Sequence, residues 1–451
     1  MSVQVVRVLV LVFGASGGPL GKGGVALYEF VVGNGYRLIW NKDVPWEKNG
    51  WAKYVWPMDW LKNLLAEVKA MATPGTVIAP AMWGADVVHL WAGRIIGPVA
   101  HYRSVPDDFA KRLIQESGIP AHEWSRLMGH VHPEFYQMIF SSHFWRNSTC
   151  NRYPLAVVPL ADWITLQLSG QQGHDQAMLH DQGAKAPTSK LVNLYFDCGH
   201  HGQFAPIWPL FGHDQLLEIG NGAYVVPCTH DSPLARDFAT WGLWTGSWYG
   251  VFRKVTAGDG IVPGEKTFNA GLVFEAMPNN GLSAISNIGR HGPLYKALMN
   301  ANGEISYERA ARLALTSISE IVETRLVFDD EMLKLEPELF AKSALGMAKG
   351  LETQALAGMV NTIATKCKDG LTKAATALGV PMPSEVAIVG GFAENIAILK
   401  ALKMHGITAV VPPFAGLATQ AGAAAEALRR AGMASTTAEA LAMFPNKELV
   451  E

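Results

Sequence analysis

Four short segments of the sequence hold residues that could bind a phosphorylated ligand or activate a hydroxyl group. The first, Thr229–Ser232 (THDS), places an aspartate directly after a predicted strand, among hydrogen-bonding residues. From that position Asp231 can accept a proton from a substrate hydroxyl, and phosphoryl transfer needs little else from a protein besides positioning and charge stabilisation. The same aspartate could instead cap a helix predicted from Pro233, because Asp is a favoured N-cap residue and Pro is common in the first helical turn.

Glycine turns form the other three segments. Gly390-Gly391 follows a predicted strand and precedes a predicted helix, so a nucleotide could lie against the backbone and meet the N–H groups of the helix. Gly246 lies between the hydroxyl residues Thr245 and Ser247, and such a turn can hold phosphate through backbone N–H groups and side-chain hydroxyls. Both segments are equally compatible with plain tight turns or hairpins.

The last glycine segment, residues 14–24 (GASGGPLGKGG), connects two predicted strands. It is not a Walker A loop, because Ser16 stands where the first glycine would be required and Gly23 stands where Ser or Thr would be required. This pattern excludes a P-loop kinase. Lys22 could meet a phosphate or be a solvated loop residue.

The elements that must position these segments divide the chain into two halves. The first half opens with β-branched strands at 5–13 and 25–32, which flank the glycine loop. A short strand at 224–227 leads into Thr229–Ser232 and is expected to open the second half. We therefore place a boundary at Asn221, which gives domains of residues 1–221 and 222–451.

Periodicity predicts further elements along the chain. In the first half, we expect a helix at 56–71, a strand at 76–80, a hairpin of 87–91 with 95–101, and helical structure from 107 to about 170. In the second half, we expect helices at 307–325, 336–378, 395–404 and 418–430, and strands at 385–389 and 407–411.

The composition excludes several classes of protein. Hydrophobic residues make up 49% and charged residues 17% of the 451 residues, which is enough for large cores and excludes disorder. The net charge of −2 gives no basic stripe, so we expect no nucleic-acid partner. No apolar run approaches the roughly 20 residues of a membrane helix, so we expect no membrane partner. The four cysteines show no CxxC spacing, and we expect reduced thiols in a cytoplasmic protein.

The order of the motifs resembles that of the FGGY carbohydrate kinases, and within them the rhamnulokinase branch. The segments that carry the resemblance run in order along nearly the whole chain: Val8–Gly18, Met82–Asp86, Pro98–Arg103, Pro159–Gly170, Thr229–Ser232, Thr245–Trp248, Ser286–Gly289 and Val389–Asn395.

The resemblance implies an α/β protein with two ribonuclease-H-like, actin-like ATPase domains and a cleft between them. The N-terminal domain would bind the sugar and the C-terminal domain the nucleotide. It implies ATP and Mg²⁺ as cofactors, a sugar hydroxyl as acceptor, and Asp231 as the catalytic base, and it is compatible with a homodimer. No protein ligand of the metal is assigned. The implied sugar contacts are Gly84, Asp86, His230, Ser232 and Asn287. The implied ATP contacts are Ala15, Ser16, Gly17, Gly18, Gly246, Ser247, Gly390 and Gly391.

Three positions depart from the family pattern. Val12 replaces the aspartate of the first strand, Pro19 replaces an arginine near the hairpin turn, and Phe392 replaces the third glycine of the adenosine motif. We expect the bulky Phe392 ring to hinder ordinary ATP binding. The alternative function is therefore a sugar-binding pseudokinase or regulator without phosphotransfer, or an enzyme with a different phosphate donor.

Overall fold

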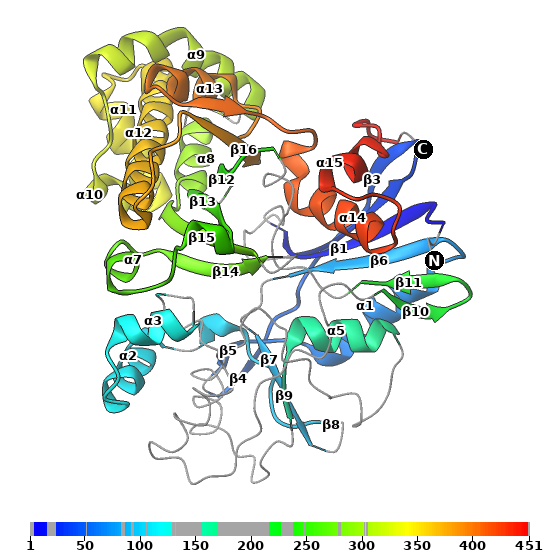
Figure 1. The fold of residues 1–451 in the computed structure, drawn as a ribbon. Coiled ribbons are helices and arrows are strands. Elements are labelled where there is room, and N and C mark those ends of the chain that lie inside the picture. Colours follow the sequence, from blue (N-terminus) through cyan, green and yellow to red (C-terminus); the bar gives the residue numbers. More distant parts are fainter. Residues whose placement is uncertain are drawn as a thin grey trace.

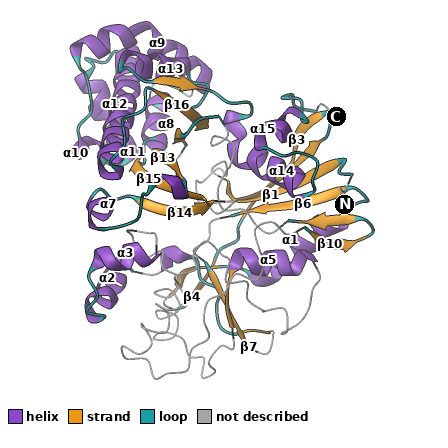
Figure 2. Cartoon of the chain, viewed as in Figure 1, coloured by secondary structure: helices purple, strands orange, loops and turns teal. Residues whose placement is uncertain are grey.

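The computed structural model describes residues 4–15, 24–50, 52–82, 86–91, 94–104, 106–128, 131, 156–169, 216–226, 238–246, 249–277, 281–301, 303 and 305–449. These residues form two six-stranded mixed sheets with helices packed against them (Figure 1). Helices gather on the outer side of the second sheet, and a smaller group of helices lies against the first (Figure 2). Among the described residues, no helix is long and apolar enough to cross a membrane.

The first sheet has the strand order β10-β11-β6-β1-β2-β3. Its strands are β1 (Arg7–Ala15), β2 (Gly24–Val31), β3 (Gly35–Asp43), β6 (Thr76–Ala81), β10 (Leu217–Gly220) and β11 (Ala223–Val225). Strands β1, β6 and β11 are parallel neighbours, and β2 returns antiparallel to β1. The strand that we expected to open the second half of the chain is thus β11, and the boundary expected at Asn221 falls between two strands of this sheet.

Strand β1 is buried on both faces because its apolar side chains alternate between two cores. Val8, Val10 and Val12 pack with the alanine-rich helix α14 (Ala418–Arg430). Leu9, Leu11 and Phe13 face the opposite core, which includes residues of α1 (Met58–Ala70) and α5 (Leu160–Ser169). Side chains on a strand point alternately to opposite faces, so this unbroken apolar run is what a central strand requires.

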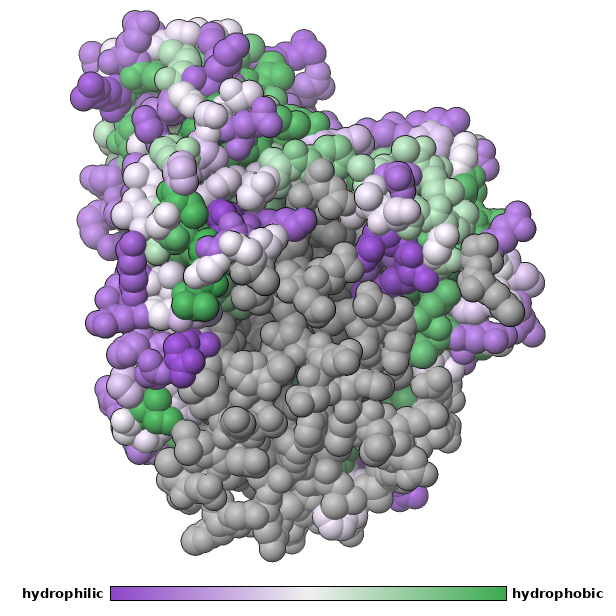
Figure 3. Space-filling model, viewed as in Figure 1, coloured by the Kyte–Doolittle hydropathy of each residue, from purple (hydrophilic) through white to green (hydrophobic). Residues whose placement is uncertain are grey.

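The second sheet has the order β14-β15-β13-β12-β16-β17. Its strands are β12 (Trp241–Thr245), β13 (Tyr249–Val255), β14 (Val273–Met277), β15 (Gly281–Gly289), β16 (Glu385–Gly390) and β17 (Thr408–Val410). The helices of this part are α7 (Glu265–Asn269), α8 (Gly292–Asn300), α9 (Tyr307–Thr324), α10 (Asp330–Leu333), α11 (Pro337–Met347), α12 (Glu352–Leu378) and α13 (Ile396–Met404). On the face seen in Figure 3, hydrophilic and hydrophobic residues are interspersed over these helices.

The remaining described elements are smaller. They are β4 (Glu47–Asn49), β5 (Ala52–Val55), β7 (Val87–Trp91), β8 (Arg94–Ile95), β9 (Ala156–Pro159), α2 (Asp107–Glu116), α3 (Ala121–Met128) and α15 (Thr437–Ala442). Strand β7 pairs with both β8 and β9. The expectation of helical structure from 107 to about 170 is therefore partly wrong: α2 and α3 are helices, but residues 156–159 form a strand and α5 begins only at Leu160.

One expected helix is broken. Residues 336–378 form α11 and α12 with a turn between them, in which Lys349 and Gly350 have positive φ angles of 53° and 78°. A positive φ cannot continue a right-handed helix, and the glycine accommodates it without steric cost. The turn lets α11 pack beside α8.

Helix α14 connects the last part of the chain to the first sheet. Its alanine face shares one core with β1 and β6 and also with Val389 of β16. Within α14, the buried Glu426 carboxylate lies 3.0 Å from Nε of Arg429 and 2.9 Å from Nε of Arg430. Two guanidinium groups therefore compensate one buried negative charge where the helix meets the sheets.

We predict that Glu426→Gln lowers the free energy of unfolding by about 3 kcal/mol, because it leaves two positive groups without the buried charge that they face. The measurement is urea unfolding followed by circular dichroism. Glu308→Gln is the matched control, since Glu308 pairs with Arg312 at the exposed surface and such pairs contribute about 0–1 kcal/mol. Equal losses in both variants would contradict the prediction.

Candidate functional site

The two glycine turns of the second sheet lie side by side. Strands β12 and β16 are parallel neighbours with Thr245 opposite Gly390, so Gly246 and Gly391 both follow at the same edge of the sheet. The Thr245 hydroxyl ties the turns together, because Oγ1 donates to the Val389 carbonyl (2.9 Å) and accepts from the Phe392 amide (3.2 Å). Ligands of open α/β sheets bind at the carboxyl ends of strands, which is where this pair of turns is placed.

The two glycines of the second turn have different structural requirements. Gly390 has a φ of 99°, and a Cβ at this position would lie 1.8 Å from the Thr245 carbonyl oxygen. Only glycine allows that close approach of the strands. Gly391 is exposed, its φ is not positive, and an added Cβ would meet no atom within 4 Å. Packing therefore explains the glycine at 390 but not the one at 391, which leaves the backbone of this turn open to a ligand.

The Phe392 ring does not lie at the nucleotide-facing position that the motif resemblance suggested. Its side chain is only 4% exposed and packs in the core of the second sheet. The ring lies 4.9 Å from the Tyr295 ring, 5.4 Å from that of Tyr307 and 5.7 Å from that of Tyr249. The ring that we expected to hinder ATP binding is therefore turned into the protein and does not lie on the exposed side of the glycine turn.

Asn395 completes the turn. Its Oδ1 accepts hydrogen bonds from the amides of Ala397 (3.0 Å) and Ile398 (3.2 Å) and so caps helix α13. Its Nδ2 donates to the Tyr295 hydroxyl at 3.5 Å. Burial is the main cause that raises the pKa of Tyr295, to about 12, so this hydroxyl stays neutral.

Asn287 lies in strand β15, next to the strand that returns from the Gly246 turn. It is exposed and pairs with Gly250, while Tyr249 pairs with Gly289. Beneath Gly289 lies the buried His291 ring, whose edge would be 2.9 Å from a Cβ at that glycine. Burial is the first cause that lowers the pKa of His291 to about 4, and nearby Lys366 lowers it further, so the imidazole is neutral at pH 7.

Asp86 of the first half is buried among aromatic rings. Its carboxylate accepts a hydrogen bond of 2.7 Å from Trp56 Nε1, and its backbone carbonyl accepts one of 2.9 Å from the Leu160 amide. The Trp46 ring lies 4.6 Å from that of Trp56 and 5.2 Å from that of His101. Burial lowers the pKa of His101, and the Asp86 carboxylate partly offsets this effect.

Several predicted site residues lie outside the described part of the chain. They are Ser16, Gly17, Gly18, Gly84, His230, Asp231, Ser232 and Ser247. The described chain stops before them at Ala15 in β1, at Met82 after β6 and at Val226 after β11. These three strands are parallel neighbours, so their carboxyl ends share one edge of the first sheet.

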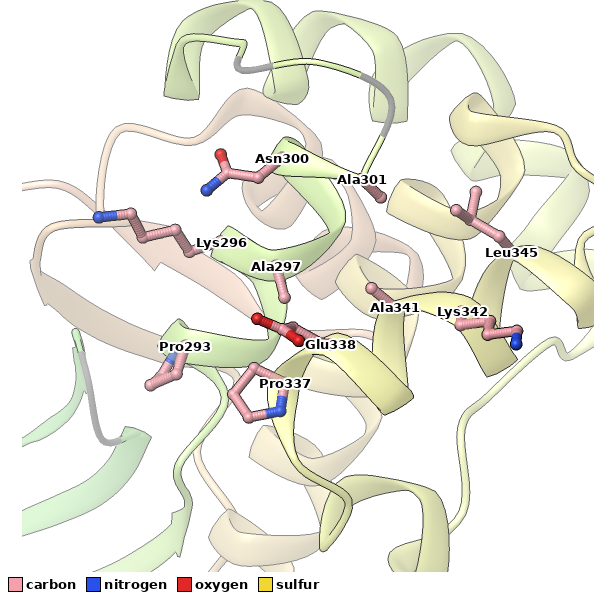
Figure 4. A pocket seen from close by; sticks show the side chains of 10 residues that line it. All are labelled: Pro293, Lys296, Ala297, Asn300, Ala301, Pro337, Glu338, Ala341, Lys342 and Leu345. Atoms are coloured by element: carbon pink, nitrogen blue, oxygen red, sulfur yellow. The ribbon is translucent and has the colours of Figure 1, made fainter.

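The described residues show no side-chain cluster for a metal. Among them, no group of three or more His, Cys, Asp or Glu residues could hold an ion. Val12, which stands where the family has an aspartate, is 3% exposed and packs against the α14 core. A pocket of about 610 Å³ lies between α8 and α11, with Lys296 and Asn300 on one side and Glu338 and Lys342 on the other (Figure 4).

Sequence reasoning missed the aromatic residues of the site. Trp56 holds the Asp86 carboxylate, and Tyr249, Tyr295 and Tyr307 surround Phe392. Trp56 and the three tyrosines belong to none of the motif segments, although Tyr249 directly follows Thr245–Trp248. No spacing in the sequence marks Trp56, Tyr295 or Tyr307.

We predict that Gly390→Ala lowers the free energy of unfolding by about 2–6 kcal/mol, from backbone strain and overlap with the Thr245 carbonyl. Gly391→Ala is the matched control and should stay within about 0.5 kcal/mol of the wild type, because its Cβ meets no atom. Thermal or urea unfolding measures both. Similar stability of the two variants would show that the strand register is different.

Comparison with known proteins identifies the fold. No family model matches the sequence, and no curated protein matches it. Solved structures do match. The xylulose kinase from Lactobacillus acidophilus aligns with a TM-score of 0.63 at 12% identity, over 98% of this chain and 94% of that one. The gluconate kinase from Lactobacillus acidophilus aligns with a TM-score of 0.63 at 11% identity, over 97% and 94%.

The glycerol kinase of Plasmodium falciparum, solved with ADP, aligns with a TM-score of 0.61 at 9% identity, over 96% of this chain and 92% of that one. These structural neighbours are FGGY-type carbohydrate kinases. At such low identities the likeness concerns the fold, and the match extends over nearly the full length of both chains. The prediction of fold class is confirmed: the chain has the two-domain α/β fold of the actin-like ATPases and FGGY-type kinases.

Proposed function

We propose that this protein is a carbohydrate kinase that transfers the terminal phosphoryl group of ATP to a sugar hydroxyl. The observation that carries the proposal is the paired glycine turns at Gly246 and Gly391. Two turns separated by more than a hundred residues adjoin at the carboxyl edge of parallel strands, and one of them has a glycine that packing does not require. Their arrangement suits the phosphates of a nucleotide, because exposed backbone N–H groups favour anions.

The nucleotide would be held from both domains. Gly246, Ser247, Gly390 and Gly391 would approach it from the second sheet, and the segment Ala15–Gly18 would approach from the end of β1. When bound with the nucleotide, Mg²⁺ would neutralise part of the charge of the phosphates. Its protein ligands are not assigned, and the roles below do not depend on them.

The sugar would be bound at the carboxyl edge of the first sheet. We assign its contacts to Gly84, Asp86, His230, Ser232 and Asn287 by the motif resemblance. The hydrogen bond from Trp56 fixes the orientation of the Asp86 carboxylate. The half-buried Trp46 ring, 4.6 Å from that of Trp56, supplies apolar surface of the kind that packs against a sugar ring.

We further propose a ketose or deoxy-ketose of the rhamnulose type as acceptor, because the motifs resemble the rhamnulokinase branch. The structural neighbours are named for xylulose, gluconate and glycerol, so these three compounds belong in the substrate panel. Asp231 would take the proton from the acceptor hydroxyl as the oxygen attacks the phosphoryl group. Closure of the two domains would exclude water, which otherwise hydrolyses ATP.

The first test is ADP release by the purified full-length chain with Mg²⁺–ATP and the sugar panel. Sugar-dependent ADP release supports the proposal. ATP binding without turnover on any sugar would instead support the pseudokinase reading that Val12 suggests. If calorimetry finds no ATP binding to the folded protein, the proposed function is wrong.

We predict that Asp231→Asn reduces kcat by about 10²–10⁴-fold, because a general base contributes about that factor, while sugar affinity changes little. Steady-state kinetics gives kcat, and calorimetry with the sugar alone gives the affinity. Asp330→Asn is a suitable control, since Asp330 pairs with Lys366 at the surface of the second domain. A turnover within a few-fold of wild type in the Asp231 variant would place the base elsewhere.

A further inference from the structure

A group of four aromatic residues adjoins the Gly390-Gly391 turn through Phe392, the next residue in the chain. This aromatic cluster consists of Tyr249, Tyr295, Tyr307 and Phe392. Phe392 is its centre, and its ring stands perpendicular to those of Tyr295 and Tyr307, with interplanar angles of 86° and 89°. Edge-to-face contacts of this kind stabilise the packing beyond simple burial. The cluster is therefore a rigid support for the turn.

One member of the cluster differs from the rest. Tyr249, Tyr295 and Phe392 are almost fully buried, whereas Tyr307 is 48% exposed. Tyr307 is the first residue of α9, and its ring is nearly parallel to that of Tyr295, with an interplanar angle of 7° and 6.5 Å between the ring centroids. The side of Tyr307 that faces the protein is thus fixed by two rings, while the other side is open to solvent.

The open ring lies beside the candidate nucleotide site. Phe392 follows Gly391 directly in the chain, and its ring centroid is 5.4 Å from that of Tyr307. A ligand whose phosphates lie on the Gly391 backbone would therefore extend its remaining atoms over or past this aromatic surface. Tyr307 belongs to none of the sequence motifs.

We propose that Tyr307 is the platform on which the base of the nucleotide stacks, an inference that rests on the proposed nucleotide-dependent function. Aromatic side chains bind nucleobases by stacking because every base offers a π-face. A ring that is already held on its protein side loses little freedom when a base covers the other side.

The same geometry predicts weak selection among bases. The polar atoms of Asn395, which follows the turn, already have partners within the protein: Oδ1 caps α13 and Nδ2 contacts the Tyr295 hydroxyl. These bonds fix the orientation of the Asn395 side chain, and stacking itself tolerates different bases because every base has a π-face. ATP and GTP should therefore bind with affinities within a few-fold of each other.

Calorimetry with the full-length protein and Mg²⁺ tests the proposal with three probes: ATP, GTP and inorganic tripolyphosphate. Tyr307→Ala should weaken ATP and GTP by about 5- to 150-fold, the range that a stacked base contributes (about 1–3 kcal/mol). It should leave tripolyphosphate unchanged, because that probe has no base. Tyr307→Phe keeps the ring and should bind all three probes as the wild type does. Leu339→Ala, an exposed position on α11, is the control for a surface change elsewhere.

The outcomes separate this inference from the proposed function. If the wild type binds neither nucleotide, both the proposed function and this inference are overturned. If the wild type binds ATP and Tyr307→Ala binds it equally well, only this inference is overturned. If Tyr307→Ala loses ATP and tripolyphosphate to the same extent, the ring supports the turn and does not contact the base, which also overturns it. A tenfold or greater preference for ATP over GTP in the wild type contradicts the predicted base tolerance.

Discussion

The arrangement of the candidate site depends on the register between β12 and β16. These strands are parallel, and they come so close at Thr245 and Gly390 that no other residue than glycine fits at 390. The Thr245 hydroxyl then donates a hydrogen bond to Val389 in β16 and accepts one from Phe392 in the turn beyond it, so the geometry of this turn depends on the neighbouring strand β12. The two turns follow neighbouring strands that are far apart in the sequence. A shift of β12 relative to β16 would therefore change the positions of both turns.

The sequence predicts which residues form a strand more easily than it predicts which strands pair with one another. The β-branched run at 5–13 predicted a strand, and the glycine pairs predicted turns at the ends of strands, which the structure confirms. The register of β12 against β16 spans some 140 residues of chain and leaves no local pattern in the sequence. The strand at 223–225 shows the same difficulty, since its residues predict a strand but do not tell which sheet it joins.

The direction in which a side chain points was the other feature that the sequence could not predict. The motif comparison placed Phe392 at the nucleotide, because it considered only the position in the chain. In the folded protein the Thr245 hydrogen bond holds the Phe392 amide toward the turn, and the ring enters the core between Tyr249 and Tyr295. Asp86 is similar: its position in a motif was clear, but the hydrogen bond from Trp56 connects residues 30 apart and follows from the packing alone. The assignment of Asp231, by contrast, still rests on the sequence.

Helix α14 has a mechanical consequence for the two domains. One face of it packs against β1 and β6 of the first sheet, and the same core includes Ala387 and Val389 of the second. Most of the buried side chains on this helix are alanines, which have no rotamers to rearrange and present a smooth surface. Two layers in contact through such a surface can slide by small amounts without repacking, as in shear motions between packed elements. Relative movement of the two domains would thus take place by sliding along α14, while the apolar core around this helix remains packed.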